Sequence, residues 1–354
     1  MGDIEEILRL ATKKNASDIH LQAGLPPVLR VQSRLVALDS EKLSAEAIER
    51  LIFSIMSEQQ KEIFQDRLEF DFSYGLPGVG RFRINVFKQR NSVAAAFRHF
   101  PHEIPSPEAL GLPSAVVELA NLKRGFVLFT GAAGQGKSTS LAAMIDRINR
   151  DRQAHIITLE DPIEYIFHHK QSVVVQRELG KDMHDFASAL RAALREDPDV
   201  ILVGEMRDFH TIEAALIAAE TGHLVLATLH THNAAQSVDR IVDVFPPHQQ
   251  QQIRTQLANV LHAVVTQQLI RRKDGGLCLG VEFLLVNSAI KNLIRDAKTH
   301  QIQTVLQTGV AAGMITMESS LKALYDRGVI TEDDALEHAF DAREMARVLG
   351  RRQL

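Results

Sequence analysis

The sequence predicts an α/β protein of two domains, and three observations lead to this fold class. An apolar run at residues 126–129 precedes the glycine-rich stretch Gly131–Ser138, and apolar residues at helical spacing follow it. Further downstream, apolar runs alternate with helical patterns, which is typical of a mostly parallel sheet. Four of the 11 prolines fall within residues 101–113, and proline disfavours helix in the residue before it. We therefore expect an extended linker there, between a first domain of residues 1–100 and a second domain of residues 114–354.

The bulk composition excludes several classes of protein. The 354 residues are 45% hydrophobic, and no apolar run approaches the roughly 20 residues that span a bilayer. Acidic residues directly after Met1 predict that no signal peptide is present. The single cysteine, Cys278, excludes an intramolecular disulfide and a cysteine-rich zinc site, which fits a reducing compartment. We therefore expect a cytoplasmic protein. Because the net charge of −4 provides no overall basic field, we do not expect it to bind nucleic acid.

The first domain is expected to be of the α+β class. Apolar residues at helical spacing over residues 4–11 predict an amphipathic helix that stops at Asn15. Apolar and polar residues alternate over residues 68–74 and again over 81–86, on either side of a turn at 75–80 that is rich in Gly and Pro. This pattern predicts an antiparallel hairpin, and a further strand is expected over residues 92–97.

Arginines gather on one face of this predicted sheet. The period of two places Arg81, Arg83 and Asn85 away from the core, and Arg98 follows the third strand. One interpretation is a solvated sheet face. The other is an arginine finger, in which an arginine from a neighbouring subunit stabilises the charge that develops on a γ-phosphate. The second interpretation requires an oligomer.

In the second domain, the ends of four predicted strands carry reactive side chains. The strands are expected at residues 126–129, 155–159, 200–203 and 224–229, with helical patterns at 186–194 and 212–219. They are followed in turn by the glycine-rich stretch, by Glu160 and Asp161, by Glu205, and by His230. Since ligands bind beyond the carboxyl ends of parallel strands, these side chains predict one site at that edge of the sheet.

The glycine-rich stretch matches the phosphate-binding loop G-x-x-x-x-G-K-[ST]. Glycines allow successive backbone N–H groups to face one concavity, and the start of the following helix adds positive partial charge. Lys137 can reach the β- and γ-phosphates, and Ser138 can offer its hydroxyl to Mg²⁺. A chance match is disfavoured because the motif lies between a strand and a helix. The predicted nucleotide-binding residues are Gly131, Ala132, Ala133, Gly134, Gln135, Gly136, Lys137, Ser138 and Thr139.

Glu205 is the best candidate for the catalytic carboxylate. It follows an apolar strand, where a carboxylate can orient water for in-line attack on the γ-phosphate. Such strands usually offer an aspartate just before this glutamate, but Gly204 occupies that position. Magnesium would then depend on Ser138, with Glu160 or Asp161 acting through water.

Five of these candidates have structural alternatives. Glu160, Asp161 and Glu164 could form a turn that is set by Pro162. His230 could simply be a hydrogen-bonded histidine at a strand end. Glu205 could be a surface carboxylate, although the neighbouring phosphate-binding loop favours a catalytic role.

Five stretches of the chain resemble the secretion ATPase superfamily. Leu159–Tyr165 is similar to its aspartate box, Arg195–Asp208 to its Walker B motif and Thr221–Thr231 to its histidine box. Ala16–Leu21 resembles the start of its N-terminal PAS-like domain, and Ala289–Asp296 a C-terminal motif of the pilus-retraction branch. The resemblance implies a PAS-like domain followed by a RecA-like ATPase domain with a C-terminal helical region, assembled as a homohexamer.

The resemblance also implies roles for individual residues. Lys137 and Ser138 would bind phosphate and Mg²⁺, and Glu205 would be the catalytic glutamate of an ATPase. The partner would be an inner-membrane platform protein of the pilus machinery, and ATP-driven motion would remove pilin. The remaining assignments are Glu160, Asp161 and Glu164 to the aspartate box, His223 and His230 to the histidine box, and Arg81, Arg83 and Arg98 to nucleotide contacts across subunits.

Two features favour retraction over assembly within the superfamily. Assembly-type relatives usually carry four zinc-binding cysteines, which this chain lacks, and the C-terminal motif is that of the retraction branch. The chain departs from the family at Ala132, Ala133 and Gln135 of the loop, and at Lys291, where arginine is common. An accessory retraction ATPase, which would partner a paralogous ATPase, therefore stays open. So does a nucleotide-gated interaction protein with little turnover, whereas the acidic balance disfavours a nucleic-acid motor.

Overall fold

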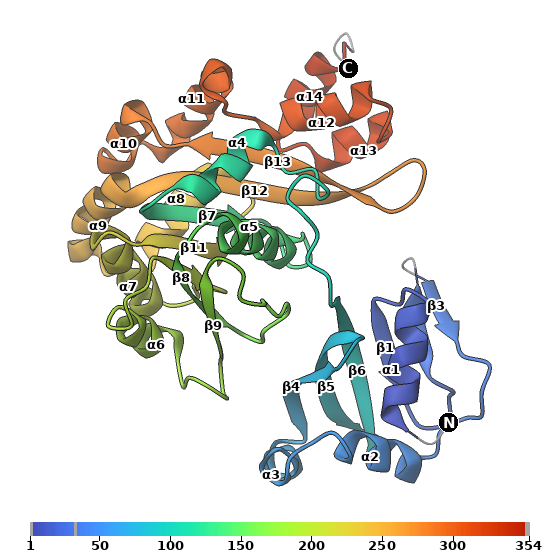
Figure 1. Ribbon diagram of the computed structural model, residues 1–354. Coiled ribbons are helices and arrows are strands. Elements are labelled where there is room, and N and C mark those ends of the chain that lie inside the picture. Colours follow the sequence, from blue (N-terminus) through green and yellow to red (C-terminus); the bar gives the residue numbers. More distant parts are fainter. Residues whose placement is uncertain (1–2, 32–33, 351–354) are drawn as a thin grey trace. The chain divides into compact units, whose positions relative to one another are not determined.

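The computed structural model describes residues 3–31 and 34–350, which form two compact units (Figure 1). The first unit comprises the described residues up to Ile104 together with Pro162–Ile166. The second comprises Pro105–Asp161 and the described residues from Phe167 onward. A short segment from the middle of the sequence therefore packs with the N-terminal unit.

The first unit is an antiparallel sheet with helices packed against it. In the described residues the strand order is β3-β2-β1-β6-β5-β4, and every neighbouring pair is antiparallel. Its strands are β1 (Asp18–Leu21), β2 (Val28–Val31), β3 (Arg34–Ala37), β4 (Glu69–Leu76), β5 (Gly80–Gln89) and β6 (Ser92–Pro101). Its helices are α1 (Ile4–Lys13), α2 (Ala45–Phe53) and α3 (Glu58–Arg67).

The sequence patterns in this unit predicted its elements well. Helix α1 buries Ile4, Ile7, Leu8 and Ala11, as expected from their spacing, and Asn15 has a left-handed backbone with φ 52° that ends it. On β5, Phe82, Ile84 and Val86 lie in the core while Arg81, Arg83 and Asn85 alternate with them on the half-exposed face.

Two details of the predicted hairpin were wrong. Leu68 is not in the strand: it caps α3 with φ 63° and is exposed, because a left-handed residue is a common way to end a helix. The turn is also shorter than residues 75–80, since β4 extends through Leu76 and β5 starts at Gly80.

The second unit is a mostly parallel sheet covered by helices, as the sequence predicts. Its described strand order is β13-β12-β7-β11-β10-β8-β9, and only the β12–β13 pair is antiparallel among these. The strands are β7 (Gly125–Thr130), β8 (His155–Glu160), β9 (Val173–Glu178), β10 (Val200–Val203), β11 (Leu224–Leu229), β12 (Leu261–Arg271) and β13 (Leu277–Leu285). The first helices are α4 (Ser114–Val117), α5 (Lys137–Asp151), α6 (Phe186–Ala193), α7 (Phe209–Glu220) and α8 (Ala234–Asp243). The later helices are α9 (Pro247–Val260), α10 (Ser288–Arg295), α11 (Ile302–Thr308), α12 (Met317–Asp326), α13 (Glu332–His338) and α14 (Ala342–Val348).

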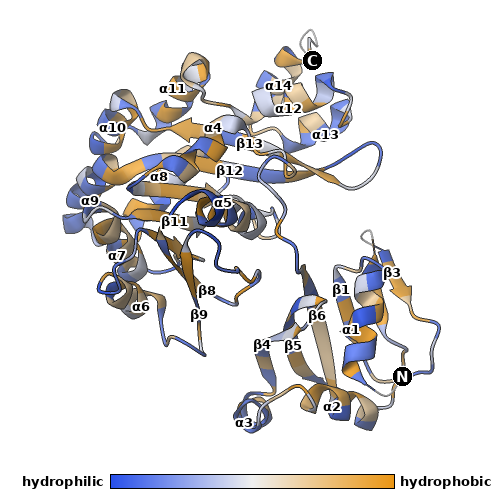
Figure 2. Cartoon of the chain, in the orientation of Figure 1, coloured by the Kyte–Doolittle hydropathy of each residue, from blue (hydrophilic) through white to orange (hydrophobic). Residues whose placement is uncertain are grey.

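Burial explains why the central strands are continuous apolar runs. The residues of β10 and β11 are buried without alternation, because helices cover both faces of the sheet. Figure 2 shows the hydrophobic residues along β7, β8 and β11. A smaller apolar cluster joins Ile270 of β12 to the C-terminal helices through Met317, Leu321 and Met345. The sheet is thus packed between apolar side chains of the helices.

Glu282 of β13 is a carboxyl group buried in this unit. Its Oε1 accepts a hydrogen bond from the N–H of Ala234, 2.9 Å away at the start of α8. Its Oε2 has no hydrogen-bond partner among the described residues. Burial, offset in part by that hydrogen bond and reinforced by the charge of Glu318, raises the pKa of Glu282 to about 7.

Replacing Glu282 with glutamine should remove a pH-dependent loss of stability. The pKa of the Glu282 carboxyl is about 7 in the folded protein and near 4.5 in the unfolded chain, so the folded state binds the proton more tightly. The folded state therefore loses stability as pH rises through 7. The difference in the free energy of unfolding, variant minus wild type, should be about 2 to 3 kcal/mol more favourable to the variant at pH 8 than at pH 5. Denaturant unfolding at both pH values measures this gain, with Glu220→Gln as the exposed control. Equal differences at the two pH values would contradict the prediction.

Candidate active site

The glycine-rich loop joins β7 to α5 at the carboxyl edge of the sheet. A side chain at Gly131, where φ is 137°, would place its Cβ 2.5 Å from the carbonyl oxygen of Gln267. Only glycine fits this approach of the loop to β12. Helix α5 then starts at Lys137, so the loop backbone and the first turn of the helix face one concavity.

Lys137 is the cation at the centre of this loop. Only 7% of the residue is exposed, and its Nζ donates hydrogen bonds to the carbonyl oxygens of Gly131 and Ala132, each at 2.8 Å. The same Nζ lies 3.4 Å from Nδ1 of His230, which follows β11. The ammonium therefore connects the loop to the neighbouring strand end.

Gln135 attaches the loop to β12 in a way that the sequence did not reveal. Its Oε1 accepts a hydrogen bond of 2.5 Å from the N–H of Leu269. The pairing of β7 with β12 ends at Thr130 and Thr266, so the glutamine side chain continues the hydrogen bonding beyond the strand. On the same strand, Nε2 of Gln267 donates to Oγ of Ser140 on α5, at 2.7 Å. These bonds fix the loop against the sheet.

Replacing Gln135 with methionine should weaken nucleotide binding by loosening this attachment. Methionine keeps the length of the side chain but leaves the N–H of Leu269 without its acceptor, a loss of about 1 kcal/mol. We expect the KM for ATP to rise about fivefold with a smaller change in kcat. Steady-state phosphate release measures both values, and Gln252→Met on the exposed side of α9 is the matched control. An unchanged KM would exclude this role.

Glu205 lies in a chain of charged groups that ends at Lys137. Its Oε1 is 3.2 Å from Nε2 of His230, and its Oε2 is 2.7 Å from a guanidinium nitrogen of Arg207. His230 therefore lies between the carboxylate and the ammonium of Lys137, in contact with Glu205 through one ring nitrogen and with Lys137 through the other. The ends of β7, β10 and β11 thus supply one connected set of side chains.

The charges of this set fix its ionisation near neutral pH. Partial burial alone would raise the pKa of Glu205, but the hydrogen bond and charge of Arg207 and the charges of His230 and Lys137 lower it below its usual value. Burial lowers the pKa of His230, and the charge of Lys137 adds to this effect against the opposing charge of Glu205. Glu205 is therefore an ionised carboxylate that can orient or deprotonate a water molecule.

The backbone packed around Gly204 accounts for the absence of an aspartate before Glu205. A Cβ at this position would lie 3.0 Å from the carbonyl oxygen of Leu159 and 3.3 Å from Cα of Glu160, both in the backbone of the neighbouring β8. The N–H of Gly204 donates to Leu159, and its carbonyl oxygen accepts from Oγ1 of Thr228 on β11. The close packing of three strand ends leaves little room for a side chain here, so an aspartate would require this backbone to shift by a few tenths of an ångström.

The aspartate-box carboxylates are divided between the two units. Oε1 of Glu160, at the end of β8, accepts hydrogen bonds from Oγ1 of Thr158 at 2.6 Å and from Nε2 of Gln176 at 3.1 Å. Asp161 is the last residue before the chain enters the first unit, and Glu164 belongs to that unit. The sequence predicts these carboxylates as one group and did not predict this division.

The predicted arginines all belong to the first unit and form local contacts. Arg83 pairs with Asp71 at 3.6 Å, Arg98 with Asp18 at 3.2 Å, and Arg81 donates to Ser73 at 2.7 Å. Arg81 also lines a cavity of about 270 Å³, whose other walls are the 75–80 turn region, His102, Glu164 and Ile166. Arg81 and Glu164, two predicted site residues that are distant in sequence, therefore share one cavity.

The other histidine-box residue has a structural contact. Nδ1 of His223 lies 2.9 Å from the carbonyl oxygen of Ala218 and 3.1 Å from Oγ1 of Thr221, at the end of α7. The C-terminal motif Ala289–Asp296 lies on α10. Across residues 3–31 and 34–350, no group of three or more His, Cys, Asp or Glu is arranged to hold a metal ion.

Comparisons with known proteins show the family to which the chain belongs. The family described as "Type II/IV secretion system protein" matches residues 2–330. The chain is 45% identical, over 95% of its length and 98% of the relative, to the type IV pilus retraction ATPase PilT of Pseudomonas aeruginosa. It is 42% identical to the type IV pilus ATPase PilU of the same organism, over 97% of this chain and 92% of PilU. A crystal structure of the pilus retraction motor PilT with bound ADP is similar with a TM-score of 0.90 and 50% identity, covering 98% of this chain and 99% of that one.

Proposed function

Because the chain belongs to the type II/IV secretion system protein family, we infer that it is an ATP-hydrolysing motor that drives the retraction of type IV pili. The observation that carries this conclusion is the similarity to retraction ATPases along nearly the whole chain, including an ADP-bound motor. The expected fold class, with an N-terminal domain before an ATPase domain, is the one that this motor has.

We assign the nucleotide to the loop between β7 and α5. Backbone N–H groups of Gly131–Thr139 would hold the phosphates of ATP, and the ammonium of Lys137 would neutralise their charge. Mg²⁺ typically binds one or two carboxylates together with substrate phosphates and water, so a cage of protein ligands is not required. Ser138 would supply its hydroxyl, and Glu160 or Asp161 would act through water.

Hydrolysis itself would depend on Glu205. Its ionised carboxylate would orient the water for in-line attack on the γ-phosphate, and it is held in place by Arg207 and His230. Neutral His230 contacts both side chains, so it would couple a displacement of Lys137 to the position of the Glu205 carboxylate. Glu164, together with Arg81, Arg83 or Arg98, would complete the site from a neighbouring subunit of a homohexamer.

Replacing Arg83 with alanine should lower turnover while leaving the affinity for ATP largely intact. The arginine would act mainly on the charge of the transition state, and two other arginines remain, so we expect a loss of about tenfold in kcat. Phosphate release by assembled rings measures this loss, and Arg9→Ala, an exposed arginine of the same unit, is the control. Unchanged turnover in assembled rings would reject the role of Arg83.

The remaining assignments concern the cellular context. No helix in the described part of the chain is long and apolar enough to cross a membrane. We place the motor in the cytoplasm at the inner membrane, bound to a platform protein of the pilus machinery and without nucleic acid. Residues 1–100 would be the PAS-like domain, 101–113 the linker and 114–354 the RecA-like ATPase domain, with Pro162–Ile166 contributed to the first unit.

Deletion of the gene tests the proposed function directly. Hyperpiliated cells that do not twitch are expected, whereas bald cells would point to pilus assembly instead. The nearly equal similarity to PilU favours one second candidate, an accessory retraction ATPase. In that case single pili of the deletion strain would still retract, at reduced force, and measurement of retraction in an optical trap separates the two.

A further inference from the structure

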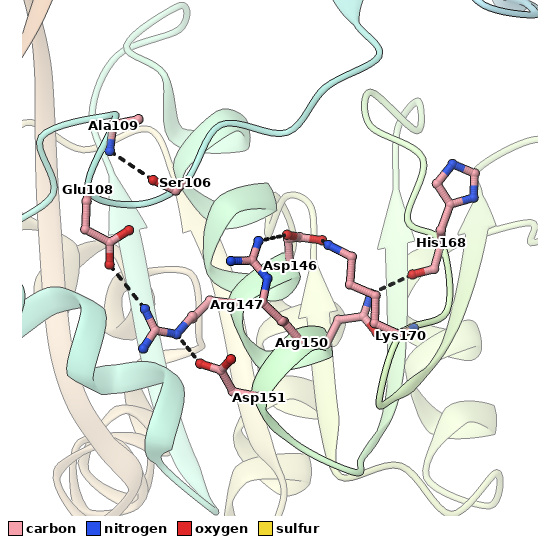
Figure 3. A network of polar contacts seen from close by, with 10 residues as sticks. Ser106, Glu108, Ala109, Asp146, Arg147, Arg150, Asp151, His168 and Lys170 are labelled. Atoms are coloured by element: carbon pink, nitrogen blue, oxygen red, sulfur yellow. Dashed lines mark hydrogen bonds and ion pairs between the residues drawn. The ribbon is translucent and has the colours of Figure 1, made fainter.

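The phosphate-binding loop is connected through one helix to a distant cluster of polar contacts. Helix α5 starts at Lys137 and carries Asp146, Arg147, Asn149 and Arg150 near its other end. At 1.5 Å per residue, Asn149 lies about 18 Å along the helix axis from Lys137. Figure 3 shows this cluster, in which side chains of α5 meet residues from two other stretches of the second unit.

The first of these stretches is the return of the chain from the first unit. Asn149 is fully buried, and its Nδ2 donates to the carbonyl oxygen of His168 at 2.7 Å while its Oδ1 accepts from the N–H of Lys170 at 3.1 Å. Its carbonyl oxygen also accepts from the N–H groups of Gln171 and Ser172. A single asparagine thus bonds to four of the five residues 168–172 of the returning segment.

An ion pair strengthens this attachment. Asp146 is 7% exposed, and its two carboxylate oxygens lie 2.5 Å from Nζ of Lys170 and 3.0 Å from a guanidinium nitrogen of Arg150. The same helix contacts the other connection to the first unit, because Arg147 pairs with Glu108 of the linker region at 3.2 Å. Both connections are therefore held by the last turns of α5.

The excursion between these anchors carries the aspartate box. Gln176 of β9 bonds to the residues at both ends of this excursion. Its Nε2 donates to Glu160 at 3.1 Å, and its Oε1 accepts from the N–H of Phe167 at 2.9 Å. Residues 161–166 lie between these two points and include Glu164. Any movement of residues 168–172 relative to β8 must therefore shift or strain this short excursion.

We expect nucleotide binding to displace α5. Nζ of Lys137 donates to two loop carbonyls and faces His230, so its three N–H groups are directed at protein atoms. A phosphate that reaches this ammonium must displace at least one of these contacts. The loop and the first turn of α5 are then expected to rearrange, and a helix transmits such a displacement along its axis.

We propose that Asn149, supported by the Asp146–Lys170 ion pair, is a positioning residue that couples the nucleotide state of the loop to the aspartate-box excursion. This inference rests on the proposed function, because it requires a nucleotide in the loop. Asn149 does not contact the reacting groups. Through Asn149, the position of Glu164 and its neighbours would depend on whether the loop at the start of α5 holds a nucleotide.

Hydrogen exchange of the full-length protein tests the coupling, with ADP and Mg²⁺ as the probe. In the wild type, ADP should slow exchange in peptides covering residues 131–140 and also in those covering 161–172. In Asn149→Ala, the first effect should persist and the second should disappear. Steady-state kinetics should show a kcat lowered about tenfold with the KM for ATP within about twofold of wild type. Because a loss of folded protein would lower the apparent kcat in the same way, the persisting ADP response of residues 131–140 serves as the check that the variant is folded.

Lys170 provides variants at a partly exposed position, in case Asn149→Ala does not fold. Lys170→Gln should reduce the response of residues 161–172 to ADP about twofold, whereas Lys170→Arg, which keeps the charge, should retain it. Lys322→Gln, which removes an exposed ion pair on α12, should behave as wild type. An equal ADP response of residues 161–172 in wild type, Asn149→Ala and Lys170→Gln would overturn the coupling alone. Absence of any ADP effect on residues 131–140 of the wild type would overturn the proposed nucleotide site as well.

Discussion

Replacing Lys137 with alanine should reduce kcat/KM for ATP hydrolysis by about 10³-fold, the typical effect of removing one preorganised charge from a phosphoryl-transfer site. Lys137 is the buried cation of the loop, and its ammonium bridges two loop carbonyls and the histidine that contacts Glu205. Alanine would remove the charge that faces the phosphates and also the contact that joins the loop to β11. Both ATP affinity and turnover should therefore fall.

Phosphate release by the purified protein measures this effect. Lys322→Gln is the matched lysine control, because it lies on α12 of the same unit and its side chain is 33% exposed. Thermal unfolding of both variants verifies that the fold is intact. A Lys137→Ala protein that hydrolyses ATP within about tenfold of the wild-type rate would refute the assignment of the loop as the catalytic nucleotide site.

Glu205→Gln should abolish most turnover while ATP binding persists. Glutamine keeps the shape of the side chain and one oxygen that can accept from Arg207, but it cannot act as a base and carries no negative charge. We expect kcat to fall by about 10² to 10³-fold, with little change in the dissociation constant for ATP. The two effects separate a catalytic carboxylate from a surface carboxylate.

Single-turnover hydrolysis and equilibrium nucleotide binding should be measured on the same preparation. Glu196→Gln is a suitable control, since Glu196 is an exposed carboxylate of the second unit that pairs with Arg177. If the Glu205→Gln protein turned over at a rate close to that of Glu196→Gln, the water-orienting role would have to be given to another residue. Glu160, which lies at the neighbouring strand end, would be the first to consider.

Local patterns in the sequence were sufficient to predict the sheet of the second unit and which candidate residues lie at its edge. The apolar runs of β7, β8, β10 and β11 are continuous because both faces of the sheet are covered. The phosphate-binding motif consists of residues that are adjacent in the sequence, so it can be recognised without the fold. The rule that the ends of parallel strands meet at one edge predicted that Lys137, Glu205 and His230 would lie at one edge of the sheet. Their contacts with one another are seen only in the structure.

The features that were not predicted depend on contacts between residues far apart in sequence. The bond between Gln135 and Leu269 joins positions 134 residues apart, and no local pattern marks either partner. The buried carboxyl of Glu282 lies in an otherwise apolar strand, so only the packed structure shows its burial. Leu68 was placed in a strand because it is apolar and precedes an alternating run, whereas its backbone conformation depends on how α3 ends.

The division of the aspartate box has a consequence for how such proteins can be cut or recombined. Ile163 and Tyr165 are buried apolar residues that pack in the first unit, and the ring of Tyr165 lies 6.5 Å from that of Phe100. A chain that starts at Pro105 would keep these two side chains but lose the surface that covers them, and it would expose them to water and to aggregation. The N-terminal unit is therefore not an interchangeable module. A chimera that exchanges it between relatives needs a second crossover pair around residues 162–166, and gene fusions joined only at the linker would inherit a mismatched contact.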